Sequence, residues 1–190
     1  MNNKTLSIWI EGTILAALAI VLSYVPTKIG NFSISLGMIP VILYAIRRGP
    51  VKGMVCGFLW GILHFVGPNL EILNFWQGLI DYFLAYTFIG LAGVFSAFIT
   101  KSIRKEKEKK VKVQIVLSTA IGTIGRYFWH FISGMIFYGQ YAPKGMAPAV
   151  YSLTVNGANA LATGFVTAVV LVFLQTTSKN LFMPKRISYN

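Results

Sequence analysis

The sequence has few charged residues and a single cysteine. Only 12% of the 190 residues are charged while 55% are hydrophobic, proportions outside those of an ordinary soluble domain. The lone Cys56 excludes a disulfide framework and a paired-cysteine metal or redox motif. Phosphate-binding loops and the HExxH and GxSxG motifs are also missing. The sequence therefore predicts neither an ATP site nor an enzyme, and no metal or cofactor.

Long apolar runs take up most of the chain. A helix needs about 20 apolar residues to cross a bilayer core of about 30 Å. Six stretches approach or exceed that length, although the second is short and would have to tilt. We predict an all-α integral membrane protein in which residues 1–190 form one domain embedded in the lipid bilayer. The six predicted spans are 6–25, 33–46, 51–67, 76–100, 112–138 and 149–175.

The chain is basic, with a net charge of +12. Its lysines and arginines lie between apolar runs rather than on a soluble surface, which argues against nucleic acid as a partner. All 17 except Lys28, Lys144 and Arg126 fall on one side of the predicted spans, and such residues accumulate on the cytoplasmic side. We therefore predict cytoplasmic termini for a multi-pass protein of the plasma membrane. The one-sided residues are Lys4, Arg47, Arg48, Lys52, the seven between 101 and 112, Lys179, Lys185 and Arg186.

Small residues recur at helical spacing on two of the predicted spans. Glycines follow one another every four residues at Gly49, Gly53, Gly57 and Gly61, which leaves one helix face bare. We expect that face to pack inside the molecule. A second stripe on the first span either packs internally or docks on a separate subunit, and the pattern leaves both open. That stripe is Gly12, Ala16, Ala19 and Ser23.

Polar side chains inside a membrane span are costly and usually face a cavity. With the predicted topology, five of them from four helices fall in the outer half of the membrane. The simplest geometry is one pocket open to the outside, with Gln77 one turn from Asp81 and with Trp129 and Tyr138 nearby. The alternative for each group is a hydrogen bond between helices. The five converging residues are His64, Asp81, His130, Tyr151 and Asn156.

The residue types predict the ligand class. One carboxylate among aromatic rings is typical of a site for a flat cation, because a cation over an aromatic face gains about 0.5 to 2 kcal/mol. Asp81 would neutralise the charge. Arg126, one turn below His130, is expected to have a structural role.

Several longer motifs carry a family resemblance. The sequence resembles the thiamine-specific substrate-binding subunits of energy-coupling factor (ECF) vitamin transporters, which are six-helix membrane proteins of bacteria. The resemblance covers most of the chain. It rests on NFSISLGMIP (31–40), RRG (47–49), GFLWGILHF (57–65), IDY (80–82), GRYFWHFISG (125–134) and YSLTVNG (151–157). The last two of these motifs are the most specific.

The resemblance implies a function and a set of site residues. Members bind thiamine from outside and dock on a shared transmembrane coupling protein that carries two ATPase subunits. Asp81 matches the acidic residue that faces the thiamine cation and Tyr82 its neighbour, while His130, Tyr151 and Asn156 match other binding positions. The small-residue stripe of the first span, around Ala16 to Ala19, resembles the family's docking surface.

The chain departs from the family pattern at two site positions. Asp81 stands where glutamate is usual, and Tyr138 stands where tryptophan is expected to stack on the ligand. A close analogue of thiamine, such as a precursor or its pyrimidine part, therefore stays open as the ligand.

Two other functions fit the same polar residues. A proton-coupled secondary transporter would titrate His64, Asp81 and His130 during its cycle. A membrane assembly protein would use the polar groups only to hold helices together and would bind no ligand.

Overall fold

The computed structural model describes residues 3–67 and 70–184, so Lys185 and Arg186 of the predicted basic side lie outside the described residues. Within these ranges the chain is helical apart from its loops, and an isolated antiparallel bridge joins Ile29 to Phe32. The main helices are α1 (Asn3–Ser23), α2 (Met38–Arg48), α3 (Pro50–Leu63), α7 (Glu108–Phe137) and α8 (Pro148–Thr177), with 3₁₀ turns η1 (His64–Val66), η4 (Gly139–Tyr141) and η5 (Lys179–Phe182).

The fourth helical segment runs from Phe75 to Arg104 and changes its winding along the way. A π-helical stretch begins after the first turn, and such stretches occur mostly as short bulges at functional sites. This one carries Asp81 and Tyr82, so the wider turn shapes the part of the helix that we predicted to bind ligand. The parts are α4 (Phe75–Gly78), the π-helix η2 (Leu79–Leu84), α5 (Ala85–Phe88), the 3₁₀ helix η3 (Ile89–Phe95) and α6 (Ser96–Arg104).

Helical segments coincide with all six apolar stretches, but they differ in length. Three are long and apolar enough to cross a membrane, namely Thr5–Ser23, Phe75–Arg104 and Pro148–Thr177. The 11 residues of α2 rise by only about 16 Å, which is about half of the hydrocarbon core. The helical membrane fold is thus present, while six crossings and cytoplasmic termini stay predictions.

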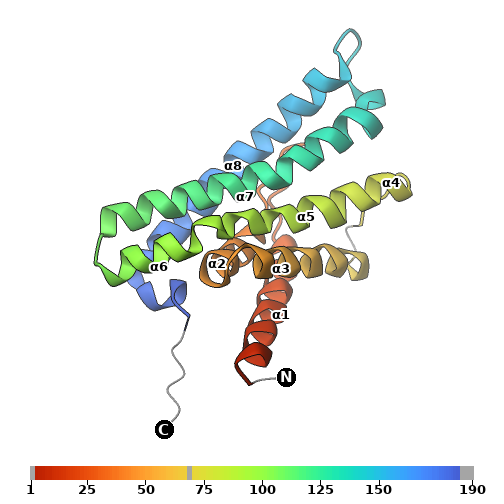
Figure 1. Ribbon diagram of the computed structural model, residues 1–190. Coiled ribbons are helices and arrows are strands. Elements are labelled where there is room, and N and C mark those ends of the chain that lie inside the picture. The colour runs from red at the N-terminus through yellow and green to blue at the C-terminus, as the bar shows by residue number, and fades with distance from the viewer. Residues whose placement is uncertain (1–2, 68–69, 185–190) are drawn as a thin grey trace.

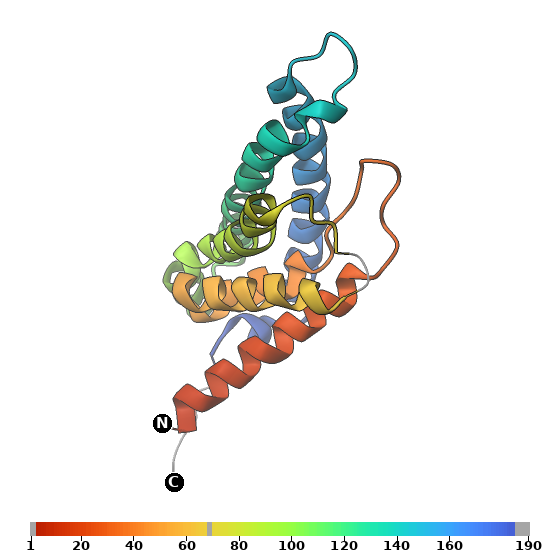
Figure 2. The ribbon, with the colours of Figure 1, turned by 90° about the vertical axis from the view of Figure 1, so that its right-hand side faces the viewer.

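The longest helices lie side by side (Figure 1). α7 and α8 form an antiparallel pair joined by a loop at one end, and the segment α4 to α6 runs along α7. α2 and α3 pack against the same segment, and α1 lies beneath them at an angle (Figure 2). The chain between α1 and α2 leaves this body as a long loop that returns along α8.

The polarity of the molecule is that of a membrane protein, with apolar side chains outside and polar ones inside. On α8, Leu161 is 78% exposed and Phe165 is 70% exposed, whereas Thr163 between them is fully buried. Exposed apolar surface of this extent marks contact with lipid or a membrane partner. Ser118 and Gln175 are buried likewise.

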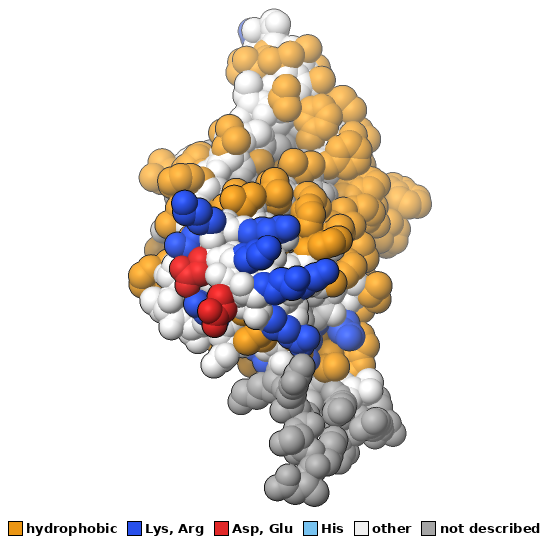
Figure 3. All heavy atoms as spheres, turned by 60° about the vertical axis from the view of Figure 1, so that its left-hand side comes forward, with side chains coloured by type: hydrophobic (Ala, Val, Ile, Leu, Met, Phe, Trp, Pro, Cys, Tyr) orange, Lys and Arg blue, Asp and Glu red, His pale blue; other side chains and the backbone are white. Residues whose placement is uncertain are grey.

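Basic side chains gather at the end where α6 joins α7 (Figure 3). The C-terminal segment closes this end, because Lys179 forms an ion pair of 2.7 Å with Glu108 and Arg47 donates a hydrogen bond to the carbonyl of Leu181. The hydrogen bond from Lys179 lowers the pKa of Glu108. The loop that contains Lys144 lies at the opposite end (Figure 1). The charge pattern predicted that these residues face opposite sides of the membrane, and that sidedness stays a prediction.

Three glycines of the predicted stripe, Gly53, Gly57 and Gly61, pack inside the molecule as expected, whereas a Cβ atom on Gly49 would meet nothing within 4 Å. A Cβ atom on Gly57 would overlap the carbonyl oxygen of Tyr86, and one on Gly61 would overlap that of Tyr82. Only glycine allows the backbones of α3 and the fourth segment to approach so closely.

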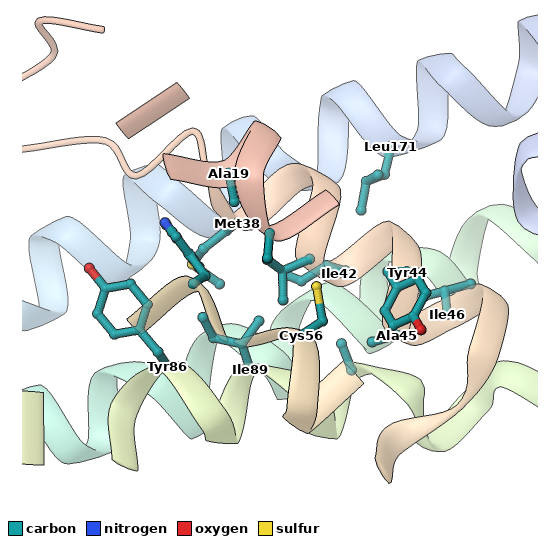
Figure 4. Packing of buried hydrophobic residues seen from close by; sticks show 14 of the residues in the cluster. Ala19, Met38, Ile42, Tyr44, Ala45, Ile46, Cys56, Tyr86, Ile89 and Leu171 are labelled. Atoms are coloured by element: carbon teal, nitrogen blue, oxygen red, sulfur yellow. The ribbon is translucent and has the colours of Figure 1, made fainter. Parts of the chain in front are cut away.

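The stripe on α1 also faces inward, which corrects its predicted place at a partner-docking surface. Gly12, Ala16 and Ala19 are buried, and Ser23 is partly buried and accepts a hydrogen bond from Trp60. Figure 4 shows Ala19 among the buried residues of α2. Small residues allow close packing against any neighbour, and here the neighbours are α2 and α3 of the same chain.

Candidate ligand-binding site

Two adjoining cavities lie between the loop after α1, the fourth segment, α7 and α8. One has a volume of about 690 Å³ and the other of about 260 Å³, sizes typical of small-molecule sites. They share five lining residues, which makes them parts of one site: Lys28, Ser33, Glu71, His130 and Asn156.

Asp81 lies at the base of the smaller cavity and is 9% exposed. Its Oδ2 accepts hydrogen bonds from Gln77 Nε2 (2.6 Å) and Ser133 Oγ (2.8 Å). Its Oδ1 lies 2.9 Å from His130 Nδ1. Gln77 Nε2 also donates to the Tyr138 hydroxyl at 3.1 Å. The structure thus brings four of the predicted site residues into one hydrogen-bonded cluster.

The protonation of His130 follows from its two neighbours. Arginine can only donate, so the 3.2 Å contact from Arg126 Nε makes His130 Nε2 an acceptor without a proton. The proton therefore sits on Nδ1 and is donated to Asp81. A neutral imidazole connects a guanidinium to a carboxylate, and the charge of Arg126 is compensated by Asp81 through His130.

Arg126 lines the larger cavity, although we assigned it no ligand role. Its guanidinium donates to Ser35 Oγ at 2.6 Å and lies 4.4 Å from the centre of the Tyr86 ring. The rings of Trp60 and Tyr127 are also within 6 Å of it. These cation–π contacts replace a direct carboxylate partner and hold the charge at the floor of the cavity.

Helix α8 supplies the opposite wall. Asn156 Nδ2 donates to the carbonyl of His130 at 3.2 Å. Gly134 of α7 has no side chain, which lets α8 approach α7 closely at this point. Tyr151 lines the smaller cavity and accepts a hydrogen bond from Asn31 of the loop. Both predicted residues of α8 therefore lie at the site.

The loop after α1 is fixed to α8 by backbone contacts. Asn159 accepts from the N–H of Ser33 at 2.8 Å and donates to the carbonyl of Asn31 at 3.0 Å. Thr163 accepts from the N–H of Ser35. Asn159, one turn after Asn156, was missed by sequence reasoning, although its spacing on the same helix face could have indicated it.

His64 and Tyr82 line the larger cavity, but their polar atoms are already bonded within the protein. His64 Nδ1 donates to the carbonyl of Trp60 at 3.0 Å and its Nε2 accepts from Tyr86. The Tyr82 hydroxyl contacts both the N–H and the carbonyl of Glu71. Only the ring faces of these two residues are left for a ligand.

Trp129 does not lie at the site, which corrects its predicted placement. Its indole packs edge-on against Phe88 and Phe128 and lines neither cavity. A helix turns by about 100° per residue, so the neighbour of an inward-facing His130 points elsewhere.

A helical fold with a lipid-facing exterior and a polar internal cavity defines the class of membrane-embedded transport proteins. Comparison with known families agrees: residues 9–183 match the model of the thiamine transporter protein family (Thia_YuaJ). The chain belongs to this family.

Individual relatives support the assignment over nearly the whole length. The thiamine transporter ThiT of Lacticaseibacillus paracasei is 39% identical over 97% of this chain and 94% of its own. That of Bacillus subtilis is 33% identical over 95% and 96%. A solved structure of ThiT from Listeria monocytogenes, 42% identical, superposes with a TM-score of 0.93 and covers 96% of this chain and 100% of its own.

Family membership settles three of the predictions. The resemblance seen in the motifs is confirmed, and the family consists of transport proteins rather than enzymes. Together with the apolar helices, it makes the chain a multi-pass protein of the bacterial cell membrane.

Proposed function

We propose that this protein binds thiamine, or a close analogue such as a precursor or its pyrimidine part, in the joined cavities and mediates its uptake. The observation that carries the proposal is a ligand-sized cavity built on the hydrogen-bonded cluster of Asp81, in a chain whose relatives are named thiamine transporters. We further propose that the cavity opens to the outside.

The chemistry of the lining suits a flat cation with a polar edge. Arg126 already occupies the face of Tyr86, and other rings that line the cavities, among them those of Tyr82 and Tyr138, can face the cationic part. The amide of Asn156 and the hydroxyl of Tyr151 face the same space and can bind polar ring substituents. Tyr138 supplies less stacking area than the tryptophan expected at this position.

Binding is tested by titrating the detergent-purified protein with thiamine and following tryptophan fluorescence. Trp60 lies within 6 Å of Arg126 at the cavity floor, so an occupied cavity should give saturable quenching. Titrations with the pyrimidine part alone and with the thiazole part alone identify the half that is recognised. A protein that is quenched by none of the three does not have the proposed function.

For uptake we propose the role of the substrate-binding subunit of an ECF-type transporter, with a transmembrane coupling protein and two ATPase subunits as partners. A proton-coupled carrier, the alternative, is not favoured by the comparisons. His64 and His130 also have both ring nitrogens engaged within the protein. Uptake that needs the ATPase subunits and survives a protonophore supports the ECF role, and the reverse pattern supports the carrier.

The small-residue stripe of α1 that matched the family's docking surface is buried. We therefore place the docking surface for the coupling protein on the outward face of α1. Thr13 and Ala17, four residues apart, are exposed there, and Ile14 (60% exposed) and Val21 (61%) lie on the same side of the helix. Small exposed residues at this spacing let a partner helix approach closely.

Replacing Ala17 with tryptophan should therefore separate binding from transport. We expect thiamine binding by the isolated subunit to stay unchanged and uptake by the assembled transporter to fall about tenfold, because the indole holds the partner helix away. Leu161→Trp, on the exposed face of α8, is the matched control and should leave uptake intact. Equal uptake by both variants would refute this docking surface.

A further inference from the structure

Gln77 is a buried glutamine beside the site. It is 1% exposed and lines neither of the two cavities described above, so a ligand in them does not touch it. It lies in the short helix α4, where its backbone N–H donates to the side chain of Asn74 at 3.0 Å. Any part that Gln77 plays toward a ligand must therefore pass through its neighbours.

The hydrogen bonds of Gln77 fix the orientation of its side-chain amide. A backbone N–H can only donate, so the 2.9 Å contact from Leu73 places the amide oxygen Oε1 toward this loop residue. The amide nitrogen Nε2 faces the other way and donates to Asp81 Oδ2 at 2.6 Å and to the Tyr138 hydroxyl at 3.1 Å. A reversed amide would set its oxygen against the carboxylate and leave the N–H of Leu73 unpaired, which is costly in a buried place.

These contacts join three parts of the chain. Leu73 belongs to the loop before α4, Asp81 to the π-helical stretch η2, and Tyr138 to the end of α7. Asp81 and Tyr138 both line the smaller cavity. A single side chain, with its oxygen and its nitrogen both engaged, therefore sets where two lining residues stand relative to each other.

Gln77 differs from the other two donors to Asp81. Ser133 donates to Oδ2 and His130 donates to Oδ1, and both of these residues lie on α7. Gln77 holds the carboxylate from its own helical segment and is also bonded to Tyr138. Loss of the Gln77 amide would free the carboxylate on one side and remove a hydrogen bond from Tyr138, while both donors of α7 stay in place.

We infer that Gln77 is a positioning residue of the binding site. It aligns the Asp81 carboxylate and the Tyr138 ring at the smaller cavity without touching the ligand. Asp81 offers a negative charge to the cationic part of the ligand and Tyr138 offers an aromatic face, so Gln77 acts on the recognition of the cation. This inference rests on the proposed function, because it assigns a role at the same site.

Replacing Gln77 with methionine removes the amide and keeps an unbranched side chain of similar length. Thiamine binding, measured by isothermal titration calorimetry, should weaken about tenfold, because a hydrogen bond to a charged group is lost. Binding of the uncharged pyrimidine part, measured by competition, should stay within about twofold, whereas a merely structural role would weaken both ligands alike. Gln175→Met replaces another buried glutamine (2% exposed), near the end of α8, and is the matched control with unchanged binding.

Tyr138→Phe tests the other end of the connection, because it keeps the ring and removes only the hydroxyl. We expect thiamine binding to weaken about threefold and binding of the pyrimidine part to stay unchanged. If the hydroxyl acts through Gln77, the variant that combines both changes should bind thiamine no more weakly than Gln77→Met alone. Independent effects would instead multiply to a loss of about thirtyfold.

The inference is overturned if Gln77→Met binds thiamine as the wild type does, if it weakens both ligands equally, or if the two effects multiply. If Gln77→Met unfolds below the temperature of the titration, Tyr138→Phe decides alone: selective weakening of thiamine supports the inference, and unchanged thiamine binding overturns it. If the wild type itself does not bind thiamine, it is the proposed function that fails.

Discussion

Replacement of Asp81 by asparagine is expected to weaken thiamine binding about a hundredfold, which corresponds to about 2.7 kcal/mol. The change removes the charge that compensates Arg126 through His130. It also places an amide N–H₂ opposite the donors of Gln77 or Ser133, where Oδ2 now accepts two hydrogen bonds. Breaking one side of a buried charge pair typically costs about 3 to 5 kcal/mol of folding free energy.

The loss is measured by isothermal titration calorimetry of purified protein, with the thermal unfolding midpoint recorded alongside. Asp81→Glu is the matched variant, because it keeps the charge. It should retain most of the affinity. Wild-type affinity in Asp81→Asn would show that the cluster plays no part in binding.

The second large effect is expected on folding rather than binding. A Cβ atom on Gly61 would overlap the backbone carbonyl of Tyr82, which cannot turn away as a flexible side chain can. Gly61→Ala should therefore push the fourth segment off α3 and destabilise the protein by about 3 kcal/mol. The shift also displaces Tyr82 and Asp81, so we expect thiamine binding to be lost together with thermal stability.

Gly157 on α8 provides the matched control, because a Cβ atom there would meet no other atom within 4 Å. Gly157→Ala should melt at or slightly above the wild-type temperature, since alanine favours the helix. Melting is followed by size-exclusion chromatography after heating in detergent. If the two alanine variants have the same midpoint, the close approach at Gly61 is not needed for the fold.

The polar centre of the site could be predicted from the sequence because polar groups in apolar spans are rare. Asp81, His130 and Asn156 stand out for that reason, and the alternation of spans places them at the same depth. The structure brings them to one pair of cavities. Their role in binding stays a prediction until a ligand is measured.

The direction of a small-residue stripe could not be predicted in the same way. The stripes on α1 and α3 look alike in sequence, and small residues permit close packing without naming the neighbour. Contacts such as that between Cys56 Sγ and the carbonyl of Gly12 show that α1 packs on its own chain. Only the three-dimensional arrangement decides which face is left for a partner.

Glu71 and Lys28 line both cavities and were missed because both lie in loops, where no periodicity indicates direction. Their positions depend on distant contacts, from Tyr82 to Glu71 and from Asn159 to Ser33. A loop charge between spans looks like any solvated residue until those contacts are known. The π-helical turn at Asp81 likewise has no motif that announces it.

The most direct test of the central claim is a crystal structure of the purified protein with thiamine. We expect ligand density in the joined cavities, above the Asp81 and His130 cluster. Thiamine bound instead in the cavity of about 580 Å³ beside Glu11 and Arg48, at the other end of the molecule, would contradict it.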